Sequence, residues 1–156
     1  VYGESGTGKT LIAKVLHNFS DRRTLPLVTL TEADLTEIEG PAKILARAKG
    51  GTVLFEQIGD FNDECQARIV RMIDNPLDPA PRFIATMQED AHQAVENGLI
   101  RRDLYYRLGG AIIPVPALCQ RMEDIIVLGE HFLNKGERDG VFQRNIARHS
   151  PNVHCL

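Results

Sequence analysis

The chain begins Val1-Tyr2-Gly3-Glu4-Ser5-Gly6-Thr7-Gly8-Lys9-Thr10, and residues 3–10 fit the pattern G-x-x-x-x-G-K-[ST]. Glycines let a backbone wrap closely around a polyphosphate, because a Cβ atom would clash at those positions. The successive N–H groups of such a loop point inward, and the helix that follows adds its positive N-terminal end. The pattern therefore predicts a phosphate-binding loop. The alternative, a Gly/Ser turn that only happens to precede a helix, has less support.

Two side chains of this loop have specific expected roles. Lys9 would reach the β- and γ-phosphates of a nucleoside triphosphate, and the Thr10 hydroxyl would ligate Mg²⁺. The other positions contribute backbone N–H groups, and the expected ligand is a nucleoside triphosphate with Mg²⁺. The expected nucleotide-binding residues are Gly3, Glu4, Ser5, Gly6, Thr7, Gly8, Lys9 and Thr10.

Composition indicates an ordinary globular chain. Its 156 residues suit one domain, or one domain and a small appendage, and 43% of them are hydrophobic and 25% charged. A net charge of −3 gives no electrostatic reason for this segment to bind nucleic acid. The sequence has neither an apolar run long enough to span a membrane nor a signal peptide, so we expect a cytoplasmic protein without a membrane partner. Cys65, Cys119 and Cys155 are expected to be reduced thiols.

Apolar runs and helical spacing alternate along the chain. Strands are expected at residues 27–30, 52–55, 82–87 and 111–115, and helices at 11–19, 41–49, 62–73, 91–97, 102–108 and 122–135. This alternation predicts an α/β fold, a mostly parallel sheet with helices on both sides. Only Val1-Tyr2 represents the strand expected before the loop, so we expect that strand to be truncated and the chain to be a fragment. Residues 1–135 are the expected core, and residues 136–156 a degraded tail or lid remnant.

Five stretches together resemble one family. They are GESGTGKT at 3–10, GGTVLFEQIGD at 50–60, FIATMQED at 83–90, IRRDLYYRL at 100–108 and RMEDIIVLGEHFL at 121–133. The resemblance is to the central AAA+ ATPase domain of NtrC-type bacterial transcription activators, which remodel RNA polymerase carrying sigma-54. It implies a three-layer αβα P-loop NTPase domain from a two-component response regulator. Contact with RNA polymerase or a sigma factor would need the whole protein, and DNA would be bound by a domain outside this chain.

The resemblance places Glu56-Gln57 where the family's Walker B strand ends in Asp-Glu. Glu56 keeps the charge of the first acid and is the expected second Mg²⁺ ligand, on a stem one methylene longer. Gln57 can hydrogen-bond the attacking water but cannot accept its proton. Losing such a group costs about 10²–10⁴ in rate. The alternative is that both are ordinary polar residues that end a strand.

The resemblance assigns three further catalytic candidates. Gln88 takes the sensor I position, near the γ-phosphate, although an ordinary polar residue after a strand is an equal alternative. Arg101 and Arg107 take the positions of arginine fingers, which reach the γ-phosphate of a neighbouring subunit in a homo-oligomer. Arg102 is expected to be a surface charge.

Two family segments are missing or eroded. The family inserts a Gly-Ala-Phe-Thr-Gly-Ala loop that contacts sigma-54, whereas here only residues 31–49 connect Leu30 to Gly50, without that sequence. Pro151-Asn152-Val153 resembles part of the family's lid, but His154 and Cys155 replace the expected Arg and Glu. We therefore expect no sigma-54 contact by the usual route.

Three functions remain open at this point. The favoured one is an ATP-binding AAA+ module with weak or no hydrolysis. The second is an active ATPase that remodels RNA polymerase, in which Glu56 or Asp60 replaces the lost acid. The third is a structural or interaction domain that does not use nucleotide.

Overall fold

The computed structural model describes residues 1–138 of the chain. It divides into two compact units, Val1–Pro116 and a second that begins at Ala117. The division predicted near residue 135 stays a prediction, and the predicted tail beyond Arg138 lies outside the described residues.

A parallel sheet forms the centre of the first unit. Strands β1 (Leu27–Leu30), β2 (Thr52–Phe55) and β3 (Arg82–Ala85) follow one another in that order across the sheet. β2 is central, and all four of its residues are buried, as expected for a continuous apolar run. The first three predicted strands are therefore confirmed, and the α/β fold with them.

The prediction of a fourth strand at residues 111–115 is wrong. Only Pro114 forms a bridge there, in parallel with Tyr2, and Tyr2 also bridges to Met87. β3 likewise ends at Ala85, two residues earlier than predicted. A strand needs a partner along its length, and Val1-Tyr2 is too short to pair with more than a few residues on either side.

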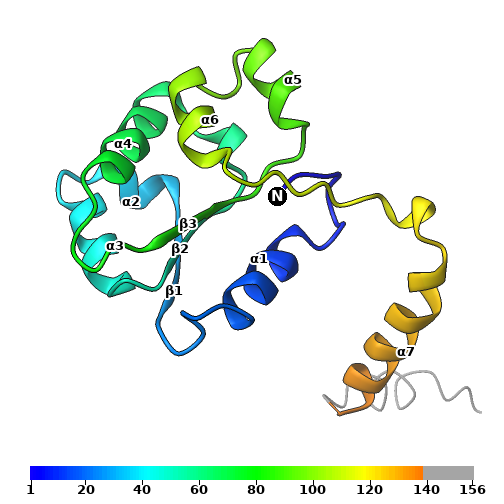
Figure 1. Cartoon of the computed structure of the whole chain (residues 1–156). Helices are drawn as coiled ribbons and strands as arrows, with labels where there is room; N and C mark the ends of the chain where they lie inside the picture. The colour runs from blue at the N-terminus through cyan, green and yellow to red at the C-terminus, as the bar shows by residue number, and fades with distance from the viewer. Residues whose placement is uncertain (139–156) are drawn as a thin grey trace, which may run out of the picture. The chain divides into compact units, whose positions relative to one another are not determined.

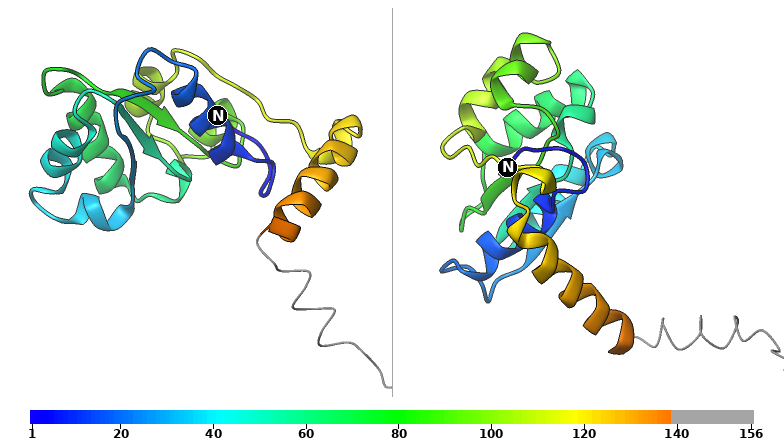
Figure 2. Two further views of the ribbon diagram at one scale, coloured as in Figure 1. Left: turned by 90° about the horizontal axis from the view of Figure 1, so that it is seen from below. Right: turned by 90° about the vertical axis from the view of Figure 1, so that its right-hand side faces the viewer.

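Helices cover both faces of this sheet, so the predicted three-layer arrangement is confirmed (Figure 1). α1 (Lys9–Asn18) lies on one face. The other face carries α3 (Gly40–Ala48), α4 (Asp63–Asp74) and α6 (Arg102–Leu108), and the turned views in Figure 2 agree. The shorter elements of this unit are α2 (Glu32–Thr36), the 3-10 turn η1 (Ile58–Asp60) and α5 (Ala91–Glu96).

The core lies mainly between the sheet and the α3, α4 and α6 layer. Side chains of β2 alternate between the faces: Val53 and Phe55 join this main core, while Leu54 packs with Ala13 of α1 on the opposite face. The main core also includes the fully buried residues Leu30, Leu35, Ile44, Ile69 and Leu104.

A cavity of about 470 Å³ runs along β3 on the side away from β2. Apolar residues dominate its lining, among them Leu16, Phe83, Ile84, Ile100 and Ile112. Phe83 and Ile84 are consecutive on β3 and so project to opposite faces of the sheet. The cavity therefore follows the outer edge of β3 and reaches both of its faces.

The second unit contains the short turn η2 (Leu118–Gln120) and the long helix α7 (Glu123–Arg138), which confirms the helix predicted at 122–135. Glu123 and Asp124 occupy its first turn, where negative charge is favourable. Several of its apolar side chains are exposed, including Ile126, Phe132 and Leu133. In residues 1–138 no helix is long and apolar enough to cross a membrane.

Candidate phosphate-binding site

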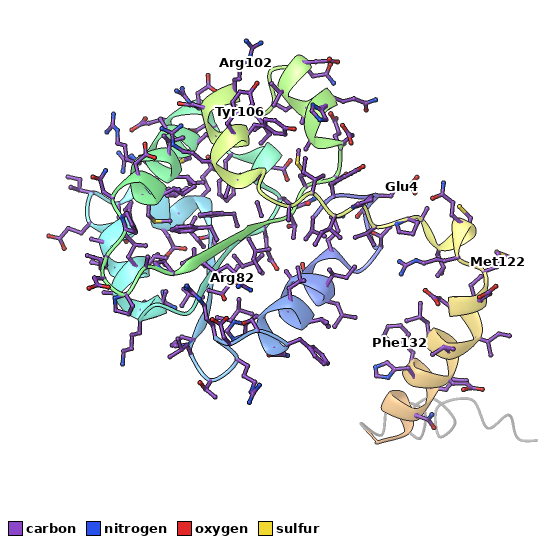
Figure 3. The ribbon with its side chains drawn as sticks, viewed as in Figure 1. Glu4, Arg82, Arg102, Tyr106, Met122 and Phe132 are labelled. Atoms are coloured by element: carbon purple, nitrogen blue, oxygen red, sulfur yellow. The ribbon has the colours of Figure 1, made fainter. Side chains whose placement is uncertain are left out.

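The loop at residues 3–8 closes around the amine of Lys9. The Lys9 Nζ donates hydrogen bonds to the carbonyl oxygens of Gly3 and Glu4, both at 2.8 Å. The Thr7 hydroxyl donates to the same Glu4 oxygen at 2.8 Å. Lys9 and Thr7 are both buried, whereas Glu4 is exposed and projects outward (Figure 3). The lysine therefore shapes the loop from the inside.

Three glycines permit this path. Gly6 and Gly8 have φ angles of 79° and 92°, in the left-handed region that favours glycine. A Cβ at Gly3 would lie 2.4 Å from the Val115 carbonyl oxygen, so only glycine fits beside that backbone. The spacing of these glycines in the sequence thus corresponds to real geometric requirements.

The loop opens onto an uncapped helix end. Gly8 is the N-cap of the ten-residue α1, it supplies no side-chain cap, and the first turn contains no acidic residue. The free N–H groups of that turn and the helix dipole together favour an anion. Burial lowers the pKa of Lys9 from its ordinary value. A phosphate would offset that burial cost by supplying the opposite charge. The residues present therefore fit a polyphosphate group.

Glu56 and Gln57 follow the carboxyl end of β2. Because the strands are parallel, this end lies on the same side of the sheet as the loop that follows Tyr2. Gln57 has a left-handed backbone, with φ 52°. Its N–H donates to the Thr86 hydroxyl at 3.1 Å, and the Ile58 N–H donates to the Thr86 carbonyl at 2.9 Å. A single buried threonine therefore fixes the turn that carries both Walker B candidates.

The side chains of this pair have few partners. The Gln57 Oε1 is buried and accepts no hydrogen bond from any described residue. An unpaired buried polar atom costs about 1–3 kcal/mol, so it is a natural acceptor for a ligand or water. The Glu56 residue is half-buried, and its carboxylate likewise makes no hydrogen bond or ion pair within residues 1–138. Its expected role with Thr10 at Mg²⁺ stays a prediction.

Gln88 lies in the turn after β3 and is exposed. Its neighbour Met87 is tied to the loop, because the Gly3 N–H donates to the Met87 carbonyl oxygen at 3.2 Å. The backbone thus brings this turn beside the phosphate-binding loop. The sensor role of the Gln88 side chain stays a prediction.

The two candidate arginine fingers lie at α6, and each is held by a carboxylate. Arg101 donates to both oxygens of Asp103, at 3.1 and 2.9 Å, and Arg107 to both oxygens of Asp74, at 2.6 and 2.8 Å. These contacts raise the pKa of both arginines and lower those of both aspartates. Arg102 is exposed and projects outward, as predicted for a surface charge (Figure 3).

The sequence reasoning missed Gln66. This residue is 1% exposed, and its Nε2 donates to the carbonyl oxygens of Phe61 and Leu99, both at 2.8 Å. Its Oε1 accepts from the Arg101 N–H at 2.9 Å. Gln66 therefore links the turn after Walker B to the segment that carries Arg101. A glutamine on an amphipathic helix gives no sequence signal for such a role.

Comparison with known proteins agrees with this geometry. Residues 1–118 match the family model of the Sigma-54 interaction domain. The chain is 34% identical over 169 residues to the DNA-binding transcriptional regulator NtrC of Rhizobium meliloti (strain 1021), a match that covers 90% of this chain and 35% of that protein. It is 33% identical over 181 residues to the transcriptional activator RocR of Bacillus subtilis (strain 168), covering 97% and 38%. The chain thus spans little more than a third of these relatives.

Solved structures show the same fold. NtrX from Brucella abortus in complex with ATP superposes with a TM-score of 0.72 at 28% identity, over 89% of this chain and 38% of that one. The P-loop NTPase domain of a sigma-54 transport activator from E. coli has a TM-score of 0.58 at 24% identity, over 75% of this chain and 81% of that one. The chain belongs to the sigma-54 interaction domain family and corresponds to the AAA+ domain of NtrC-type transcription regulators.

Proposed function

We propose that this domain binds ATP or ADP, with Mg²⁺, at the loop of residues 3–10. The observation that carries this proposal is the loop itself. It encloses the Lys9 amine, needs glycine at three positions, and opens onto the uncapped end of α1. The NtrX structures in complex with ATP and with ADP support the same nucleotides here.

Titration with a fluorescent ATP analogue and Mg²⁺ tests this proposal. Lys9→Ala should abolish binding, because the amine that faces the phosphates is lost, whereas Lys14→Ala should leave it unchanged. Lys14 is an exposed lysine on the same helix and serves as the matched control. If the wild-type chain did not bind the analogue, the nucleotide-independent interaction domain would become the better description.

We further propose that hydrolysis is weak or absent. Gln57 occupies the position of the acid that activates water, and an amide cannot take up the proton. Gln57→Glu should raise phosphate release by about 10²–10⁴ if Gln57 limits the rate. Wild-type turnover at the common enzyme rate of about 1 s⁻¹ or more would contradict the proposal.

A second candidate function is an active ATPase, and one observation favours it. Glu56 is half-buried at the sheet edge with no competing partner in residues 1–138, so its carboxylate is available to a metal or water. Under this alternative, Glu56→Ala abolishes hydrolysis, and Asp60→Ala does so if Asp60 is the substitute acid. Under the favoured function, neither change has a measurable effect on ATP hydrolysis.

We also propose that this domain does not contact sigma-54 by the family's usual loop. The connection from β1 to β2 is occupied by α2 and α3, whose buried residues Leu35 and Ile44 belong to the main core. The alignment with NtrC spans 169 residues, more than the 156 of this chain, so that relative has residues in the matched region that are missing here. A pull-down with sigma-54 and an ATP transition-state analogue should recover no complex, with NtrC as the positive control.

The remaining assignments concern the whole protein. We propose that it is a bacterial two-component response regulator, that RNA polymerase is engaged only by the whole protein, and that DNA is bound by another domain. The NtrC and ZraR relatives support this proposal. Self-association through Arg101 and Arg107 is proposed on their positions at α6, and sedimentation with and without nucleotide tests it.

A further inference from the structure

The Arg107 side chain is held by hydrogen bonds to residues of two helices, α4 and α6, which are distant in the sequence. Its Nε and Nη2 donate to the Oδ1 and Oδ2 atoms of Asp74, at the last position of α4, at 2.6 and 2.8 Å. Its Nη1 donates to the Asp103 carbonyl oxygen on α6 at 3.0 Å. The guanidinium is thus fixed in plane and in direction by three hydrogen bonds.

These contacts leave part of the guanidinium available. An arginine carries five N–H donors, and the hydrogen bonds to Asp74 and Asp103 use three of them. A phosphate bound in the bidentate mode needs two. Arg107 can therefore keep both of its present partners and still bind a phosphate of a second molecule.

The pair contributes little to folding, because it is largely solvated. The side chains of Arg107 and Asp74 are 34% and 44% exposed. An exposed ion pair is screened by water and salt, and its loss rarely unfolds a domain. Its geometry nevertheless removes rotamer freedom from a long side chain, a cost that binding would otherwise have to meet.

We propose that Asp74 is a positioning residue that presents Arg107 to the nucleotide phosphate bound by a second copy of this chain. The inference rests on the proposed function, in which Arg107 acts between copies. The guanidinium of Arg101 needs no such help from another helix, since its partner Asp103 lies two residues away. The Gln66 side chain on α4 accepts only from the backbone N–H of Arg101. Asp74 thus makes the orientation of Arg107 depend on the end of α4.

An inhibitory role for Asp74 predicts a change in assembly of the opposite sign. If Asp74 only competed with the phosphate for Arg107, removing its charge would strengthen assembly. If Asp74 orients Arg107, removing its charge weakens assembly, because the free guanidinium must then be ordered on binding. The sign of the change therefore separates the two roles.

The test uses sedimentation velocity of the full chain with Mg²⁺ and a slowly hydrolysed ATP analogue. Asp74→Asn should raise the protein concentration at half-assembly by roughly two- to tenfold, the range expected for one side chain that loses its fixed rotamer. Arg107→Ala should raise it at least as much, and the double variant should match Arg107→Ala, because Asp74 acts only through Arg107. Glu37→Gln, which breaks the exposed Lys43–Glu37 pair with the same change of charge, is the control.

Each other outcome has a definite meaning. If Arg107→Ala weakens assembly while Asp74→Asn leaves it unchanged or strengthens it, the positioning role is overturned and the proposed function stands. An effect of Asp74→Asn that persists in the Arg107→Ala background also overturns it. If the wild type does not assemble, or Arg107→Ala has no effect, the intersubunit role of Arg107 fails, and the role of Asp74 fails with it.

Discussion

The backbone N–H of Gln57 donates to the hydroxyl of Thr86 at 3.1 Å, across the ends of β2 and β3. Gln57 has a φ of 52° at this point, a conformation that costs a non-glycine residue about 1–3 kcal/mol. The buried hydroxyl therefore helps to hold the Walker B turn in a backbone geometry that it would not adopt alone.

Thr86→Val tests this relationship, because it keeps the shape of the side chain and removes the acceptor. The Gln57 N–H is then left without its partner, and the free energy of unfolding should fall by about 1–3 kcal/mol. Thr86→Ser retains the hydroxyl and should cost clearly less. Urea denaturation of both variants gives the comparison, and unchanged stability in Thr86→Val would show that the hydroxyl does not support this turn.

Gly3→Ala should damage the junction between the loop and the sheet. Its Cβ would lie 2.4 Å from the Val115 carbonyl oxygen, a backbone atom of a residue whose N–H donates to the Tyr2 carbonyl oxygen. Overpacking of this kind costs about 1–3 kcal/mol. Gly59→Ala is the control, since nothing lies within 4 Å of a Cβ there. Thermal unfolding that is equally affected in both variants would exclude the steric explanation.

Gln66→Met should be among the most destabilising substitutions in this unit. It keeps an unbranched side chain but leaves the carbonyls of Phe61 and Leu99 and the N–H of Arg101 without their buried partner. Each orphaned group costs about 1–3 kcal/mol, so the three together should lower the free energy of unfolding by about 3 kcal/mol or more. Gln93→Met, at an exposed position on α5, should be neutral. Hydrogen exchange should also accelerate at Arg101 in the Gln66 variant.

The start of α2 should lose stability in acid. The Thr31 hydroxyl and N–H donate to the Asp34 carboxylate, and these bonds lower the pKa of Asp34 below its ordinary 3.8. A group with a lowered folded-state pKa stabilises the fold above its unfolded pKa and loses that contribution as the pH falls through the folded value. The contribution should therefore be complete at neutral pH and disappear below about pH 4. In Asp34→Asn this part of the pH dependence of urea unfolding should vanish, and an unchanged profile would contradict the assignment.

The parts of the fold that depend on local sequence were predictable, and those that depend on distant partners were not. The apolar run Thr52–Phe55 identified β2 because a central parallel strand is buried on both faces. Residues 111–115 have a similar pattern, yet they form only a bridge at Pro114, because among residues 1–138 Tyr2 alone pairs with them. Alternation of apolar residues does not reveal whether a partner strand is long enough.

The candidate site likewise has residues that the local sequence predicts and residues that it does not. The pattern of residues 3–10 predicted the loop, since Gly6 and Gly8 meet local backbone requirements with their left-handed φ angles. The pairing of Arg107 with Asp74 was not predictable, because the two residues are 33 positions apart and nothing in the sequence around Asp74 marks it as a partner. Thr86 was equally hidden, since a threonine that follows a strand gives no sign of the backbone that it supports.

The cavity beside β3 has a consequence for handling the protein. Along Arg82–Ala85 the strand forms a ladder with β2 on one side, while its other edge borders an apolar space of about 470 Å³. The end of this edge is covered, because the Val1 amine donates to the Ala85 carbonyl oxygen at 2.9 Å. The part of the edge before Ala85 is a template on which a strand from another molecule can pair. Concentrated solutions of this chain should therefore aggregate by edge-to-edge strand addition, independently of nucleotide. The charge of Arg82 at the start of that edge opposes such pairing.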